Sequence, residues 1–333
     1  MSSDWKTVLY EYIRRNNELE IEGTVEQISG IRDERYLQSQ QKRLNRLADE
    51  QQDRRLTRIK NELRLKLLDA KVTGDSVYAL CKMRRHLHYV QEDQKFKEER
   101  IEFQHIQLRQ KQGDWSIVKV DPLNCEAAPE PGKHFPSSGT DEPELKRGSQ
   151  PYLNPSIRMS AYEPADRKSY DREAVSRYAD TWWDYPNPEY IHFKVDCTNF
   201  VSQCLYAGGV PMDYTNRRER GWWYRGKNDQ WSFSWSVANS LFWYLSNSRS
   251  VFRAKRVDSP QLLEIGDCIL YDWNGTGHYG HSTVVAAKDA YGMPLVNAHT
   301  ANSKHRYWDY KDSYAWSEST RYAFFHIPDT IHD

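Results

Sequence analysis

The sequence predicts an α+β protein with two domains joined by a linker, and three observations support this. The 333 residues are enough for about two domains, each with its own hydrophobic core. Over the first 120 residues, the apolar residues change from helical spacing to alternation. Residues 121–155 contain seven prolines among Gly, Ser and Glu, and such a stretch buries too little apolar surface to fold alone. We therefore predict domains at 1–120 and 156–333, with the linker at 121–155.

In the first domain, polar and helix-prone stretches at 4–20 and 30–60 precede segments in which apolar residues alternate from Leu63 onward. Tight turns at Gly74-Asp75 and Gly113-Asp114 separate these segments. The order predicts helices followed by a four-stranded antiparallel sheet, and it resembles cystatin-like and nuclear-transport-factor-like domains. Domains of this architecture bind or dimerise more often than they catalyse, so we expect an accessory domain that self-associates.

In the second domain, Cys197 directly follows an acid and begins a segment with helical spacing of apolar residues, which ends at Gly208-Gly209. A thiol in the first turn of a helix lies near unpaired backbone N–H groups and the positive end of the helix dipole. Both favour the thiolate, and they can lower a cysteine pKa from about 8.5 to roughly 3.5–7.5. The segment therefore predicts a nucleophilic thiolate. The alternative is a buried structural cysteine at the start of an amphipathic helix.

Two further segments supply groups that could act with this thiol. Residues 265–285 predict a hairpin whose second strand begins at His281, just after a glycine. On a following strand, Asn297 and His299 share a face because side chains alternate. Either could hydrogen-bond the far nitrogen of the His281 ring and set its tautomer. A nucleophile, a base and an orienting polar group are the parts of a cysteine triad.

Eight short blocks resemble, in the same order, the "putative amidase domain" family of the papain-like superfamily, which is related to NlpC-type and CHAP cell-wall hydrolases. The blocks are Tyr170–Ala179, Asn187–Tyr190, Asp196–Gln203, Gly208-Gly209, Trp222–Tyr224, Gly266-Asp267, His281-Ser282 and His299-Thr300, within residues 168–327. The resemblance implies a papain-like catalytic domain, with a helix packed on an antiparallel sheet, that hydrolyses an amide through a thioester. It also implies Cys197 as nucleophile, His281 as base and His299 as third member, with Asn297 as the alternative.

By the same resemblance, the substrate is an amide of the peptidoglycan stem peptide or another peptide amide. Six further residues are expected to complete the oxyanion hole or to contact the substrate: Tyr190, Asn187, Asp196, Ser202, Trp222 and Trp223. The first two precede the helix and could donate a second hydrogen bond to the oxyanion. The two tryptophans could stack on a sugar ring or a peptide bond. Asp196 could instead be the N-cap of the helix.

Composition argues against several other classes of protein. Lys and Arg together number 47, as do Asp and Glu, so the chain lacks the basic excess expected for a nucleic-acid or membrane-surface partner. The five cysteines are scattered without metal-ligand spacing, so we expect neither a metal nor another cofactor. The first residues show no signal-peptide pattern, and no apolar run reaches about 18 residues. We therefore expect a soluble protein, cytoplasmic as synthesised, that would meet a wall substrate only after release.

Two alternative functions stay open. One is an inactive papain-like binding module, although every candidate triad position is filled. The other is a zinc-dependent hydrolase that uses His281, His299 and a cysteine, although the spacing of the two histidines matches no compact zinc motif.

Overall fold

The computed structural model describes residues 4–22, 30–123, 126, 168–226, 230–247 and 249–331. The chain forms two compact units, of which unit 1 comprises residues 1–126 and 301–316 and unit 2 comprises residues 127–300 and 317–333. Most of the linker predicted at 121–155 lies outside the described residues. Residues 301–316, which we call the returning segment, come from the second half of the chain but belong to the N-terminal unit.

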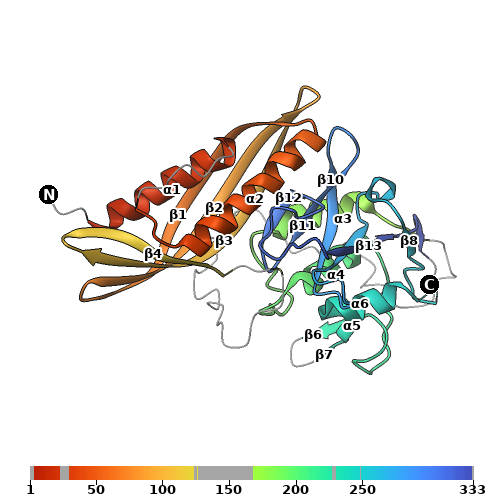
Figure 1. Ribbon diagram of the computed structural model, residues 1–333. Coiled ribbons are helices and arrows are strands. Elements are labelled where there is room, and N and C mark those ends of the chain that lie inside the picture. Colours follow the sequence, from red (N-terminus) through yellow and green to blue (C-terminus); the bar gives the residue numbers. More distant parts are fainter. Residues whose placement is uncertain are drawn as a thin grey trace. The chain divides into compact units, whose positions relative to one another are not determined.

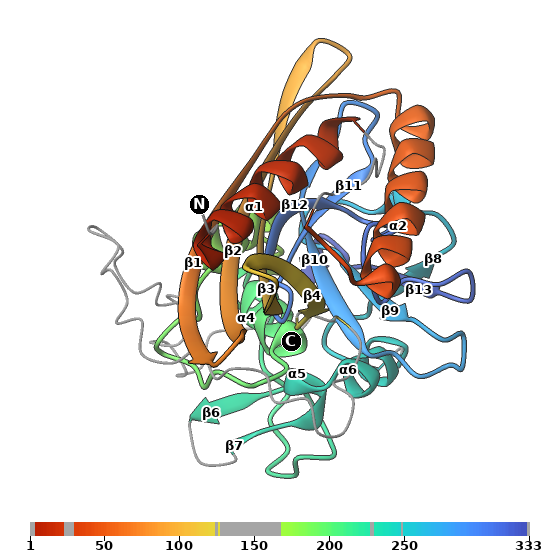
Figure 2. The same ribbon diagram turned by 60° about the vertical axis from the view of Figure 1, so that its left-hand side comes forward.

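Unit 1 is an antiparallel sheet with two helices against it (Figures 1 and 2). Its elements are α1 (Trp5–Glu22), α2 (Glu34–Asp53), β1 (Thr57–Thr73), β2 (Ser76–Gln91), β3 (Gln94–Lys111), β4 (Asp114–Pro122) and β12 (Ser303–Tyr307). Strands β1 to β4 pair in chain order, and β12 of the returning segment pairs with the first half of β3. The predicted order of helices followed by four antiparallel strands is therefore confirmed.

The core of unit 1 lies between the helices and the sheet. From Val77 to Gln91, every second residue of β2 is buried, which is the period of a strand with one face in a core. Asp33 links the start of α2 to the sheet, because its carboxylate accepts from the N–H of Tyr36 and of Val120, both at 3.0 Å. The buried apolar side chains include Leu9, Tyr12 and Leu19 of α1, Leu44 and Leu47 of α2, and Ala79, Cys81, Ile106, Leu108 and Ile117 of the strands.

Unit 2 is also α+β, with a five-stranded antiparallel sheet in the order β11-β10-β9-β13-β8. The strands of this sheet are β8 (Lys255–Val257), β9 (Cys268–Asp272), β10 (His281–Lys288), β11 (Pro294–Ala298) and β13 (Arg321–His326). The helices are α3 (Arg172–Trp182), α4 (Cys197–Ala207), α5 (Phe233–Ser236) and α6 (Ala238–Leu245). Two short pairs complete the unit: β5 (Lys168–Ser169) with β14 (Thr330–Ile331), and β6 (Tyr224–Gly226) with β7 (Gln230–Trp231).

Helices α3 and α4 pack on one face of this sheet. Ser176 of α3 donates a hydrogen bond to the carbonyl of Ala286 in β10 at 2.7 Å, and Thr198 of α4 contacts Ser282 in the same strand at 3.0 Å. α4 therefore starts beside the first residues of β10. Within the described ranges, no helix has the length and apolar character needed to cross a membrane.

Candidate active site

Cys197 is the first residue of α4, and only 2% of it is exposed. The backbone N–H groups of Asp196 and Cys197 both donate to the hydroxyl of Thr300, at 3.0 and 3.2 Å. The Cys197 Sγ lies 3.8 Å from Oγ1 of Thr198, which in turn lies 3.0 Å from Oγ of Ser282. The predicted position at a helix start is therefore correct, and three hydroxyl groups gather there.

The pKa of the Cys197 thiol differs from the sequence-based expectation. Burial raises this pKa above its ordinary value, and hydrogen bonds from Ser282 and Thr198 oppose the rise without overcoming it. The expectation that the helix start lowers the pKa of this thiol is therefore wrong for this conformation. Burial also raises the thiol pKa of three other described cysteines, Cys81, Cys204 and Cys268. Cys197 differs from them in the hydroxyl donors around its sulfur, and Cys125 lies outside the described residues.

His299 forms a buried pair with the residue that precedes Cys197. Its Nδ1 lies 2.7 Å from Oδ2 of Asp196, and its Nε2 lies 2.7 Å from the carbonyl oxygen of Trp182. Both partners are acceptors, so both bonds form together only when each ring nitrogen carries a proton. The ring also stacks on Phe200 of α4, with centroids 4.1 Å apart. His299 is thereby held in one orientation against the start of α4.

The carboxylate of Asp196 is the centre of this polar cluster. Burial alone would raise its pKa, but hydrogen bonds from His192 and His299 outweigh burial and lower the pKa to about 2. The other oxygen, Oδ1, accepts from the N–H of Phe193 and from Nδ2 of Asn199, both at 2.9 Å. Asp196 occupies the N-cap position of α4, but its side chain makes no capping hydrogen bond to the helix. It is a buried, fully bonded anion in the residue that precedes Cys197.

His192 is not evident from the sequence as a site residue, and Thr300 appears there only within the block His299-Thr300. His192 lies 3.4 Å from Asp196, its side chain is 43% exposed, and the hydrogen bond to that carboxylate raises its pKa. The only signal in the sequence for His192 is its position four residues before Asp196.

In the part of the chain that is described, no three His, Cys, Asp or Glu side chains gather as a metal site.

Asn297 also reaches α3, but at a different place from His299. Its Nδ2 donates to Oδ1 of Asp180 at 2.8 Å, whereas His299 contacts the carbonyl of Trp182. Both side chains thus point to the helix-covered face of the sheet, as alternation along the strand requires.

His281 begins β10, but its side chain points away from α4. Ser282 faces α4 through its contact with Thr198, so alternation turns His281 to the opposite face. There its ring centroid lies 5.5 Å from that of Tyr271 and 5.9 Å from that of Trp273. The structure therefore gathers Asp196, Cys197 and His299 at one point but does not bring the His281 ring to that face.

Two groups that could donate to an oxyanion, the Asn187 amide and the N–H of Cys197, already have acceptors within the protein. Asn187 is buried and donates from Nδ2 to the hydroxyl of Tyr178 at 2.9 Å. The ring of Tyr190 stacks on Trp235, with centroids 6.1 Å apart. The N–H of Cys197 already donates to Thr300. An oxyanion at this point would have to replace one of these partners.

Ser202, Trp222 and Trp223 are part of the core of unit 2. Trp222 is 0% and Trp223 4% exposed, so neither indole presents a ring face to a substrate. The Trp222 indole N–H donates to Ser202 Oγ at 3.0 Å, and Ser202 Oγ donates to the carbonyl of Trp235 at 2.9 Å. This corrects the expectation of substrate contacts, because the polar atoms of Ser202 and Trp222 satisfy each other inside the core.

Comparisons with known proteins find similarity over less than half of the chain. A family model described as "Putative amidase domain" matches residues 169–325. Uncharacterized protein YhbB of Bacillus subtilis (strain 168) is 52% identical over 160 residues, which are 48% of this chain and 51% of that protein. Uncharacterized protein YjcM of the same organism is 26% identical over 144 residues, which are 40% of this chain and 32% of that protein. The chain thus covers about half of the first relative and about a third of the second. No solved structure matches.

Proposed function

We propose that this protein is a cysteine-dependent amide hydrolase with Cys197 as its nucleophile. The match of residues 169–325 to an amidase domain supports hydrolysis of amides. The observation that carries the cysteine assignment is the position of Cys197 at the start of α4, beside a hydroxyl cluster and the buried Asp196–His299 pair. A cysteine at the start of a helix that packs on an antiparallel sheet is also the arrangement expected of a papain-like enzyme.

In the proposed reaction, a base takes the proton of Cys197 and the thiolate attacks the amide carbonyl carbon. The C–N bond then breaks, the protonated base returns its proton to the leaving amine, and water hydrolyses the thioester. The Thr300 hydroxyl and the first N–H groups of α4 lie together at the residue that carries the sulfur, so we assign them to the developing oxyanion. Asp196 and His299 act as positioning residues that hold the start of α4.

We assign the role of base to His281, which follows Gly280 at the start of β10. In the described conformation its ring lies on the other face of the sheet. The assignment therefore requires a rotation of the backbone at residues 280–281, for which a glycine is the best suited neighbour. We further propose peptidoglycan stem-peptide amides as the substrate class.

One set of observations favours a second function, an inactive binding module of the same fold. The raised pKa of Cys197, its burial and the orientation of His281 all describe a site that is not poised to react. In that case the domain would bind the peptide amide without cleaving it.

Turnover of cell-wall material separates the two functions. We expect the full chain to release new amines from Gram-positive peptidoglycan or muropeptides, and Cys197→Ala to abolish the release. Cys204→Ala is the matched control, because Cys204 is a buried thiol on the same helix and should be dispensable. Binding of muropeptides without any release by the wild type would support the binding module. Cleavage of other peptide amides only would keep the thiol chemistry and contradict the wall substrate.

A further inference from the structure

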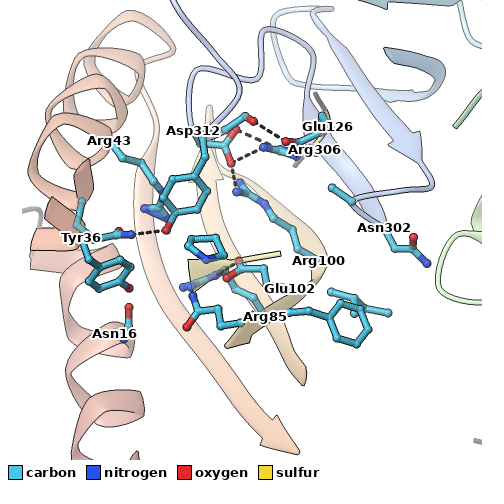
Figure 3. A pocket seen from close by; sticks show the side chains of 18 residues that line it. Asn16, Tyr36, Arg43, Arg85, Arg100, Glu102, Glu126, Asn302, Arg306 and Asp312 are labelled. Atoms are coloured by element: carbon cyan, nitrogen blue, oxygen red, sulfur yellow. Dashed lines mark hydrogen bonds and ion pairs between the residues drawn. The ribbon is translucent and has the colours of Figure 1, made fainter. Parts of the chain in front are cut away.

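Unit 1 contains a small, charged cavity that the proposed hydrolase does not use. It has a volume of about 50 Å³ and lies among α1, α2, the strands β2, β3 and β4 and the returning segment. Four arginines and three carboxylates line it: Arg43, Arg85, Arg100, Arg306, Glu102, Glu126 and Asp312. Figure 3 shows these side chains gathering between the helix that carries Tyr36 and the neighbouring strands.

Most of the charges around this cavity are paired. Arg306 bonds Glu126 at 2.6 Å and Asp312 at 2.9 Å, and Arg100 bonds the same aspartate. Arg85 donates from Nε to Glu102 at 2.9 Å. These pairs fix the positions of the guanidinium groups, since both partners are held in the interior.

Two buried N–H groups of arginines that line the cavity have no hydrogen bond within the described part of the chain. Nη1 of Arg43 has no hydrogen-bond partner among the described residues, and its Nη2 bonds Glu20. Nη1 of Arg85 also lacks a hydrogen bond, and Glu20 lies 3.4 Å from it. The side chains of Arg43 and Arg85 are 6% and 5% exposed. A buried donor without a partner costs about 1–3 kcal/mol, so such groups in native proteins usually meet water or a ligand.

The chemistry and size of the cavity indicate which kind of ligand fits it. The unpartnered buried side-chain atoms of the lining are donors, so the ligand must supply acceptors. Ile101, Phe103, Pro122 and Ala301 provide an apolar part of the wall. A cavity of about 50 Å³ holds roughly three or four atoms of the size of water, because one water needs about 10–15 Å³ on this scale. A small carboxylate with a short apolar tail fits the free donors, the apolar part of the wall and the volume. Its two oxygens can bond two guanidinium groups.

We propose that this cavity is a binding site for a short aliphatic carboxylate, and that the side chains of Arg43 and Arg85 bind the carboxylate group. The site lies in the N-terminal unit and does not depend on the hydrolase chemistry. It gives this unit a binding role of defined chemistry, and the returning segment supplies part of its wall through Ala301, Asn302 and Tyr314.

Titration calorimetry on the full chain tests the proposal with sodium acetate, sodium propionate and sodium phosphate, each against sodium chloride at equal ionic strength. We expect acetate and propionate to bind with one site per chain and to raise the unfolding midpoint. Ligand at about 100 times Kd should raise the midpoint by roughly 5–10 °C. Arg43→Gln should weaken binding at least about tenfold, the loss expected for a charged hydrogen bond.

Arg43→Gln leaves Glu20 buried without one of its partners and could unfold unit 1, so a second variant is needed. The double variant Arg43→Gln with Glu20→Gln removes the guanidinium and the carboxylate together. We expect it to fold and not to bind acetate. Lys42→Gln is the matched control, since Lys42 is an exposed cation on the same helix and does not line the cavity.

Three results would overturn the proposal. One is an acetate effect no larger than that of chloride, which would mean that water alone occupies the cavity. Another is a folded double variant that binds acetate as well as the wild type. The third is tighter binding of phosphate than of acetate, which would contradict a carboxylate site.

Discussion

Asp196 is the residue on which the candidate active site depends most. Its carboxylate takes hydrogen bonds from two histidines, one amide side chain and one backbone N–H, all while buried. Because Cys197 follows it directly, the bonds that hold Asp196 also restrain the backbone at the proposed nucleophile. The pair with His299 therefore contributes to stability and to the position of the thiol together.

The lowered pKa of Asp196 predicts a pH dependence of stability. A carboxyl whose pKa falls from 3.8 to about 2 on folding stabilises the native state above pH 4, and this contribution is lost as the pH falls through about 2. Asp196→Asn removes it, at a cost on the order of 2 kcal/mol at pH 5. We expect the difference in unfolding free energy between wild type and variant, measured in urea, to shrink between pH 4 and pH 2. A difference that stays constant with pH would contradict the assignment.

His299 and Asn297 make different contributions at this site. His299→Ala removes a buried partner of Asp196 and the ring that stacks on α4, whereas Asn297→Ala removes a contact to Asp180. We expect His299→Ala to lower kcat/KM for the amide substrate at least roughly tenfold more than Asn297→Ala, measured at equal folded fraction. The reverse ranking would transfer the positioning role to Asn297.

At the scale of elements, the C-terminal end of α4 packs closely against Val175 of α3 and the nearby Tyr170. Gly208 ends α4, and a Cβ added there would come within 2.5 Å of Val175 and 2.6 Å of Tyr170. Both of these residues are buried, at 0% and 4% exposure, so neither can move aside cheaply. This glycine is required for a close approach, since its φ of −74° suits any residue.

The two neighbouring glycines give a matched test of this packing. Gly208→Ala should destabilise unit 2 by about 1–3 kcal/mol through overpacking. Gly209 has φ of +93° and open space around it, so Gly209→Ala should cost only about 1 kcal/mol of backbone strain. Denaturant unfolding of both variants checks the order, and a larger loss for Gly209→Ala would contradict the close packing of α3 and α4.

At the scale of the whole molecule, the returning segment makes unit 1 discontinuous in sequence. Besides the strand β12, it supplies Arg306, which bonds Glu126, and Asp312, which bonds Arg100. Arg46 of α2 donates to two of its carbonyl groups. The N-terminal 126 residues by themselves lack all of these partners.

This discontinuity predicts that residues 1–126 alone fold less stably than the same residues in the full chain. Without the segment, Arg100 and Glu126 lose buried charged partners, and breaking such pairs costs about 3–5 kcal/mol each. Hydrogen exchange should show lower protection of β3 in the fragment than in the full chain. Adding residues 301–316 as a peptide should restore part of the protection, and equal protection without the peptide would contradict the prediction.

The sequence by itself determined the features that depend on local periodicity. Alternation in β2 to β4 and helical spacing before them predict α+β order in unit 1, because these periods reflect which side chains face a core. The helix start at Cys197 and the shared face of Asn297 and His299 follow from the same rule. The amidase resemblance rests on short blocks of residues and agrees with the matched range 169–325.

Only the tertiary structure decided which groups meet and how far each is buried. The turn of His281 away from α4, the raised pKa of Cys197 and the core position of Trp222 depend on strand register and on layers packed from distant segments. The return of residues 301–316 to unit 1 depends on long-range charge pairs, such as that of Arg100 and Asp312, which are 212 positions apart in the chain. Such long-range pairs leave no period in the local sequence, because their energy arises only when the chain has brought both partners out of water.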